Sequence, residues 1–157
     1  MARAVALAVV ALLGGAAQAS AAGLAEMEAR SAFIARRYLE IWSSNDGSPV
    51  AGVPYMYGPR VAFYGRPYTQ AQLADEKRRA IRQWPVRRYA HRPGTLRVTC
   101  NAATRKCAAR SIIEFEARNP VRGTAKRGSA RFDLGISFAG ETPLILYEDG
   151  SRGRRRS

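Results

Sequence analysis

The chain has 157 residues, 46% of them hydrophobic, and carries 26 basic against 12 acidic side chains, a formal net charge of +14. This length suits one domain with its own core rather than two. A single histidine and two cysteines argue against a metal site, and no cofactor motif is present, so we expect neither metal nor cofactor.

The first residues have the layout of a secretory signal peptide. Arg3 precedes the uncharged apolar run 4–13, and the small residues of 17–21 offer a cleavage site. The run is shorter than the roughly 20 residues that a membrane-spanning helix needs, which leaves an uncleaved anchor as the weaker alternative. We therefore predict a signal peptide at 1–21, a domain at 22–150 and a basic tail at 151–157, with the mature protein periplasmic or secreted.

The segment 24–43 has the spacing of an amphipathic helix. Its stripe, at steps of three and four, consists of Leu24, Met27, Ser31, Ile34, Tyr38 and Ile41, with Trp42 beside it. The turn signal 45–47 ends this helix, and the proline-containing stretch 48–59 leaves room for one short helical turn.

A strand is expected at 61–65, ended by Gly65-Arg66-Pro67. The pair Thr69 and Gln72 then forms a capping box that starts a second helix, and Pro85 stops this helix near Gln83.

Antiparallel strands are expected from residue 86 onward because apolar and polar residues alternate there. The predicted strands are 86–92, 95–100, 107–118, 129–138 and 143–148. Cys100 and Cys107 flank a polar loop between two of these strands. An even cysteine count in an exported chain, with this spacing, predicts a disulfide across the mouth of a hairpin.

Helices grouped early and strands grouped late indicate an α+β domain with helices on one face of a curved sheet. The element order and short motifs resemble the nuclear transport factor 2-like superfamily, which includes ketosteroid isomerases and SnoaL-type cyclases. The motifs are Trp42-Ser43, Phe63-Tyr64-Gly65, Asp75 to Arg78 and Trp84 to Tyr89. With its cysteine pair in the middle hairpin, the chain resembles exported alphaproteobacterial members of this superfamily, which also carry such a pair. The resemblance implies a cone-shaped fold with a mainly antiparallel sheet, and relatives often dimerise through that sheet.

Lys77 lies on the apolar stripe of the second helix, four residues after Leu73 and four before Ile81. In the cone-shaped fold that stripe faces the sheet and the cavity, where a lysine needs a partner. Glu148 shares the parity of Leu144 and Leu146 on the last strand, which makes it the best acidic partner. The pair has either a structural role or a role in a site.

The candidates for a catalytic acid or base are Lys77, Glu148 and Asp133. Asp133 lies on the polar face of its strand. Alternation there favours a cross-strand pair with Arg97 or Arg131 over a place in the cavity. His91 has no nearby acid to orient it, which argues against a catalytic dyad.

Aromatic residues are expected near the cavity, where a flat apolar ligand would contact them. The predicted ligand-binding residues are Tyr55, Tyr57, Tyr64, Lys77 and Trp84. The alternative for the tyrosines is ordinary packing at the rim.

Two basic stretches, 118–131 and 152–156, are expected to be a long hairpin tip and a solvated tail. Both offer cations to an anionic envelope surface, or serve solubility alone. Nucleic acid is not an expected partner of an exported protein.

The sequence names no reaction. It favours a non-catalytic binding module of the cell envelope that takes a small apolar or anionic ligand. The alternative is an isomerase, dehydratase or cyclase type of enzyme that transfers protons in the cone cavity.

Overall fold

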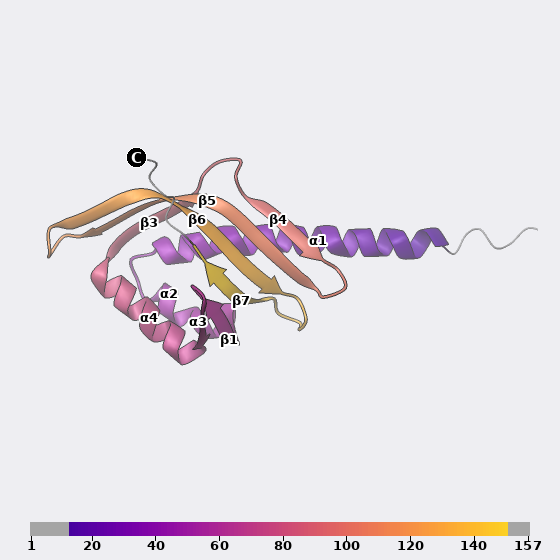
Figure 1. The fold of residues 1–157 in the computed structure, drawn as a ribbon, viewed down its shortest axis with the longest axis horizontal. Helices are drawn as coiled ribbons and strands as arrows, with labels where there is room; N and C mark the ends of the chain where they lie inside the picture. Colours follow the sequence, from indigo (N-terminus) through magenta and orange to yellow (C-terminus); the bar gives the residue numbers. More distant parts are fainter. Residues whose placement is uncertain (1–12, 151–157) are drawn as a thin grey trace, which may run out of the picture.

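The computed structural model describes residues 13–150, with side chains from residue 21 onward. Helices and short helical turns occupy the first half of this range (Figure 1). They are α1 (Leu13–Ser43), α2 (Ser48–Ala51), α3 (Val53–Met56) and α4 (Gln70–Gln83). None of these described helices combines the length and apolar character needed to cross a membrane.

Within the described residues, seven strands form one curved sheet. They are β1 (Tyr57–Phe63), β2 (Arg66–Thr69), β3 (Val86–His91), β4 (Arg97–Asn101), β5 (Lys106–Asn119), β6 (Thr124–Ser137) and β7 (Leu144–Asp149). The order is β2-β1-β7-β6-β5-β3, and β4 also pairs with β5. Only the β1–β7 pair is parallel among these strands, so the predicted α+β class with a mainly antiparallel sheet is confirmed.

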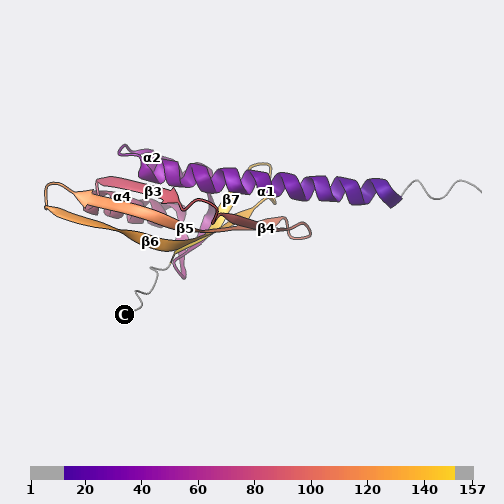
Figure 2. The same ribbon diagram turned by 90° about the horizontal axis from the view of Figure 1, so that it is seen from above.

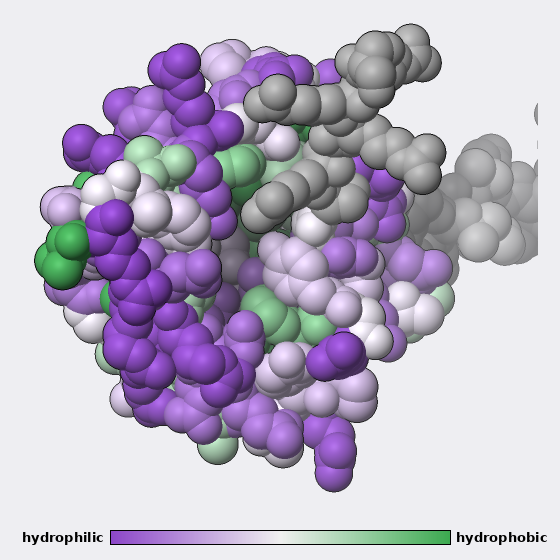
Figure 3. Space-filling model, turned by 60° about the vertical axis from the view of Figure 1, so that its left-hand side comes forward, coloured by the Kyte–Doolittle hydropathy of each residue, from purple (hydrophilic) through white to green (hydrophobic). Residues whose placement is uncertain are grey.

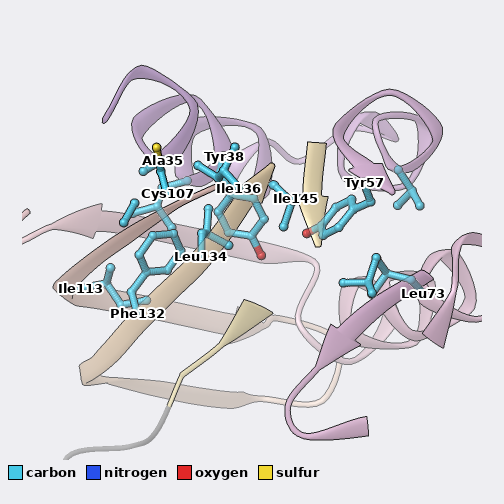
Figure 4. Packing of buried hydrophobic residues seen from close by; sticks show 14 of the residues in the cluster. Ala35, Tyr38, Tyr57, Leu73, Cys107, Ile113, Phe132, Leu134, Ile136 and Ile145 are labelled. Carbon is cyan, nitrogen blue, oxygen red and sulfur yellow. The ribbon is translucent and has the colours of Figure 1, made fainter. Parts of the chain in front are cut away.

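The core lies between α1 and the inner face of the sheet. Figure 2 shows α1 running along one face of the strands, with its N-terminal part extending beyond them. Alternate residues of β5 and β6, including Ala109, Leu134 and Ile136, are buried against the helix. Figure 4 shows Tyr38 of α1 meeting these strand residues, with Tyr57 and Leu73 on the far side of the same core.

The second helix begins as the sequence predicts. The Thr69 hydroxyl accepts from the backbone N–H of Gln72, whose side chain accepts from the backbone N–H of Thr69. Both partners of the predicted capping box are therefore present, and α4 ends at Gln83 before Pro85.

Several predicted boundaries are wrong. The first helix begins at Leu13 rather than Leu24, because the alanine-rich stretch before Leu24 is itself a good helix former. Residues 66–69 form a strand although Pro67 was expected to end one. Since β2 is at the edge of the sheet, Pro67 need not donate to a further strand.

The basic stretch 118–131 is also not a long tip. The strands β5 and β6 continue to Asn119 and Thr124, so the turn is confined to 120–123. Figure 1 shows the far end of this hairpin extending beyond the rest of the sheet. We call residues 116–127 the arm; its base, residues 116–118, still pairs with β3.

The cysteine pair lies in the hairpin of β4 and β5. Cys100 and Cys107 are direct partners in the ladder, with Cα atoms 4.0 Å apart and a disulfide between their sulfur atoms. The hairpin arrangement that the spacing predicts is thus present in the structure.

Candidate functional site

The predicted pair of Lys77 and Glu148 lies at the centre of the cone. Lys77 projects from α4 and Glu148 from β7, and their side chains are 3% and 6% exposed. The Lys77 Nζ lies 3.6 Å from Glu148 Oε2. The helix stripe therefore located the buried cation correctly, and Glu148 is its acidic partner.

Glu148 faces inward for a reason that differs from the predicted one. Leu146 is an extra residue in β7, because Ile136 pairs with Ile145 and the next residue back, Gly135, pairs with Tyr147. Such a bulge places residues three apart on one face, so Glu148 shares the buried face of Ile145 rather than that of Leu144.

Two tyrosines complete the polar cluster. The hydroxyl of Tyr38 donates to Glu148 Oε1 at 2.5 Å, and that of Tyr57 donates to Oε2. Figure 4 shows these two hydroxyl groups directed toward each other from opposite sides of the core. Burial, and then the charge of Glu148, raise the pKa of both phenols well above the ordinary value near 10. Both carboxylate oxygens thus have a hydroxyl donor.

Aromatic rings surround the ammonium group of Lys77. Its Nζ lies 4.4 Å from the centroid of the Trp42 ring, and the rings of Tyr57, Tyr38 and Phe63 follow at 5.2, 5.3 and 5.5 Å. Cation–π attraction compensates part of the lost hydration. Burial still lowers the pKa of Lys77 below its ordinary value, while the Glu148 carboxylate opposes that shift.

A cavity of about 290 Å³ opens beside this cluster, between α1, α4 and the inner face of the sheet. Its walls are mostly apolar and include Trp42, Phe63, Tyr64, Tyr89, Phe115 and Phe132. Lys77 and Glu148 also line it. Figure 3 shows a hollow in this side of the molecule, with hydrophobic residues at its walls and hydrophilic residues around it.

Lys126 of β6, which belongs to the arm, also lines the cavity. Its Nζ lies 4.4 Å from the centroid of the Trp84 ring, at the C-terminal end of α4. Trp84 is therefore a neighbour of a lining residue, but it is not itself part of the lining as predicted.

The predicted tyrosines have three different positions. Tyr64 lines the cavity, and burial raises its pKa. Tyr57, expected near the mouth, is 2% exposed in the core, because β1 begins at this residue rather than at Val61. Tyr55 is 79% exposed on α3 and lies outside the cavity lining.

Asp133 is on the outer face of the sheet. Its carboxylate accepts from Arg110 Nε at 2.9 Å, and the two residues are direct partners in the β5–β6 ladder. The predicted cross-strand pair is present, but its arginine is Arg110 rather than Arg97 or Arg131.

His91 joins α1 to the sheet. Its Nε2 lies 3.2 Å from the carbonyl of Ala35, and its Nδ1 lies 2.7 Å from the Ser111 hydroxyl. A carbonyl can only accept, so Nε2 donates, and Nδ1 of the neutral ring accepts from Ser111. Burial lowers the pKa of His91. Across residues 13–150, no three His, Cys, Asp or Glu side chains are grouped to hold a metal ion.

Sequence reasoning missed Tyr38 as a member of the site. It was placed only on the apolar stripe of the first helix, together with Ile34 and Ile41. The available signal was its hydroxyl, because a tyrosine in a buried stripe usually finds a hydrogen-bond partner.

Solved structures share this architecture across most of the chain. A nuclear transport factor 2-like superfamily protein from Salmonella enterica serovar Typhimurium matches with a TM-score of 0.69 at 11% identity, covering 85% of this chain and 95% of that one. A nuclear transport factor 2-like protein with a cystatin-like fold from Novosphingobium aromaticivorans matches at 0.61 and 16% identity, covering 93% and 92%.

A candidate dehydratase of the nuclear transport factor 2-like family from Streptomyces avermitilis matches with a TM-score of 0.64 at 6% identity, covering 79% of this chain and 94% of that one. No protein-family model and no curated protein sequence matches the chain. At these identities the likeness shows the fold alone, so the chain has the nuclear transport factor 2-like cone fold.

Proposed function

We propose that this chain is a non-catalytic module that binds a small, largely apolar ligand in the cone cavity. The observation that carries the proposal is an aromatic cavity of about 290 Å³ beside a polar cluster whose members already bond to one another. Ligand sites are typically apolar with a few placed polar groups. A flat molecule would contact Trp42 and Phe132, and an anionic group on it would meet Lys126, which also lines the cavity.

The resting contacts of Glu148 favour ligand binding over abstraction of a proton from a substrate carbon. A general base must reach a substrate proton at about 2.6–3.2 Å. Both oxygens of Glu148 instead face tyrosine donors, and Oε2 also faces Lys77. The enzyme alternative, an isomerase, dehydratase or cyclase, requires one of these contacts to open when the substrate binds.

Naphthoate, a flat aromatic anion, is a suitable probe for the cavity. The chain has two tryptophans; Trp42 lines the cavity and Trp84 lies beside Lys126, so intrinsic fluorescence reports on this site. We expect saturable quenching that weakens at least tenfold in Ala80→Leu, because Ala80 of α4 lines the cavity. Ala71→Leu, at an exposed position on the same helix, is the matched control.

Equal quenching in both variants would place the probe outside the cavity and overturn the proposal. Turnover of a bound small ketone or alcohol, lost in Glu148→Gln, would favour the enzyme alternative instead.

Export is part of the proposal. The signal-like pattern of 1–21 and the disulfide of Cys100 and Cys107 both suit an oxidising compartment, as expected for a periplasmic or secreted protein of the alphaproteobacterial type. N-terminal sequencing of the mature protein should start near residue 22. Sedimentation of the same material would test the predicted homodimer through the sheet.

The arm favours a second role, the contact with an anionic lipid surface. Between Glu116 and Asp133 the sequence has five basic residues and no acid: Arg118, Arg122, Lys126, Arg127 and Arg131. Val121, in the turn at the tip, is 95% exposed. Cations around an exposed apolar tip suit anionic headgroups, at about 1 kcal/mol for each cation near the surface.

Vesicle co-sedimentation tests this role. We expect binding to phosphatidylglycerol vesicles but not to phosphatidylcholine vesicles, with affinity falling as salt rises. The triple change of Arg118, Arg122 and Arg127 to Gln should weaken binding at least tenfold. The same change at exposed Arg36, Arg60 and Arg66 is the charge-matched control. An equal loss of vesicle affinity in both triple variants would mean that the arm contributes only its share of the overall positive charge. Binding to soluble polyanions but not to vesicles would exclude the lipid surface.

A further inference from the structure

The buried cation beside the cavity is a lysine in a chain whose basic residues are mostly arginines. Of the 26 basic residues only three are lysines, namely Lys77, Lys106 and Lys126. Lys106 is exposed and Lys126 half-buried, whereas Lys77 is buried and lines the cavity. Lysine can become a neutral, nucleophilic amine when its surroundings disfavour charge, and arginine cannot.

The ammonium group of Lys77 has long contacts to its polar neighbours. Its Nζ lies 3.4 Å from the Tyr38 hydroxyl and 3.6 Å from Glu148 Oε2, and its other near neighbours are the faces of aromatic rings. The carboxylate lies just beyond hydrogen-bond distance of the nitrogen, so a shift of the lysine side chain by less than about 1 Å, or one bridging water, lets it take a proton from nitrogen. A free amine would therefore arise at the wall of the cavity, next to an acid that can return the proton.

We propose that Lys77 captures a small aromatic aldehyde or ketone in the cavity as a Schiff base. This inference rests on the proposed function, since it requires the cavity to admit a ligand, and it names the chemical class of that ligand. Apolar walls and a volume of about 290 Å³ suit an aromatic carbonyl compound of one or two rings.

The chemistry needs no further reactant. The ammonium of Lys77 passes a proton to Glu148, and the amine lone pair forms a bond to the carbonyl carbon while the carbonyl π bond breaks toward oxygen. A proton moves from nitrogen to that oxygen, which gives a carbinolamine. Glu148 then protonates the hydroxyl group, which leaves as water, and the nitrogen lone pair forms the C=N bond.

The product suits the surroundings that the ammonium already has. One water is released, and the iminium carries the same single positive charge opposite the restored Glu148 carboxylate. The rings of Trp42 and Tyr57 face this cation as they face the ammonium. Burial also lowers the pKa of Lys77, which increases the share of free amine.

Reductive trapping with naphthaldehyde and sodium cyanoborohydride tests the proposal on the intact, disulfide-bonded chain. Peptide mass mapping should find the naphthylmethyl adduct on Lys77 at least tenfold faster than on exposed Lys106, which is the internal control for general amine reactivity. Naphthoate should slow the Lys77 reaction and leave the Lys106 reaction unchanged. The adduct at position 77 should be absent from Lys77→Arg, with folding checked by circular dichroism.

The outcomes separate this inference from the proposed function, because wild-type chain alone suffices for the decisive comparison. If naphthoate binds saturably but Lys77 reacts no faster than Lys106, the Schiff base is overturned and ligand binding stands. If naphthoate does not bind and Lys77 does not react, both fail. A fast adduct on Lys77 that naphthoate does not slow would contradict capture inside the cavity.

Discussion

Lys77 and Arg87 are both buried cations, yet their surroundings differ in kind. Lys77 faces a carboxylate and aromatic rings, and it lines the cavity. Arg87 is 4% exposed and donates to backbone carbonyls just at the ends of α1 and α4: those of Trp42, Ser44, Trp84 and Pro85. A cation is favourable beside the carbonyls of a helix C-terminus. The hydrogen bonds of Arg87 hold the ends of α1 and α4 together, and we call this arrangement the Arg87 clamp. The comparison indicates that the type of partner, rather than burial of charge, distinguishes a binding site from such a structural clamp.

The largest expected effect on the free energy of unfolding comes from removing Glu148 beside the cavity. Glu148→Ala leaves a buried ammonium and two phenols without their acceptor, and we expect a loss of about 3–5 kcal/mol in the free energy of unfolding. Lys77→Met should cost clearly less, because Glu148 keeps both tyrosine donors. Urea unfolding of the two variants measures this. A greater loss in Lys77→Met would mean that the tyrosines do not support the carboxylate.

Arg87→Met should remove the clamp and spare the cavity. The guanidinium hydrogen bonds are charge-assisted, so we expect a loss of about 2–3 kcal/mol in the free energy of unfolding. The affinity for naphthoate should change less than threefold, whereas Ala80→Leu weakens it at least tenfold. A parallel loss of stability and affinity in Arg87→Met would contradict the separation of the two regions.

Sequence periodicity was sufficient to place Lys77 in the interior, because a residue on the apolar stripe of a helix is buried together with that stripe. It was sufficient also for the fold class, because the helices and the alternating strands are separate in the chain. The partner of Asp133 was not predictable, because the register between β5 and β6 depends on a turn that was placed too long.

The bulge at Leu146 shows a further limit. Simple alternation placed Glu148 on the buried face correctly, but it did so by placing Leu144 on that face as well, which is wrong. The bulge that separates the two residues has no signal in the residue types. The clamp of Arg87 was missed for a related reason. Its partners are backbone carbonyls, which every sequence contains, and their meeting depends on how two helices end in space.

Tyr38 and Tyr57 make the contribution of the polar cluster to stability depend on pH, whereas the contribution of the Arg87 clamp does not. Burial and Glu148 raise the pKa of Tyr38 and Tyr57, so the folded state holds protons that the unfolded state releases above about pH 10. The stability that each phenol contributes is full below that pH. It falls above it by about 1.4 kcal/mol per pH unit for each phenol.

Lys77 acts in the opposite direction, because its lowered pKa makes stability rise with pH until the unfolded lysine has also lost its proton. Ultraviolet titration of the native chain should leave Tyr38 and Tyr57 protonated at pH 11, and Tyr38→Phe with Tyr57→Phe should flatten the alkaline loss of stability. Ionisation of all seven tyrosines near pH 10 without unfolding would contradict this.

The smallest expected effect concerns Trp42, whose ring faces both Lys77 and Arg87. The centroid lies 4.4 Å from Lys77 Nζ and 5.4 Å from Arg87 Cζ. Double-mutant cycles with Trp42→Leu isolate the ring, since the Trp42 carbonyl that Arg87 uses is unchanged. We expect a coupling of about 1–2 kcal/mol with Lys77, whose charge has few polar partners, and about 0.5 kcal/mol with Arg87, whose charge is already met by carbonyls. Equal couplings would mean that the ring does not distinguish the two cations, and the aromatic surroundings of Lys77 would then be packing rather than part of a site.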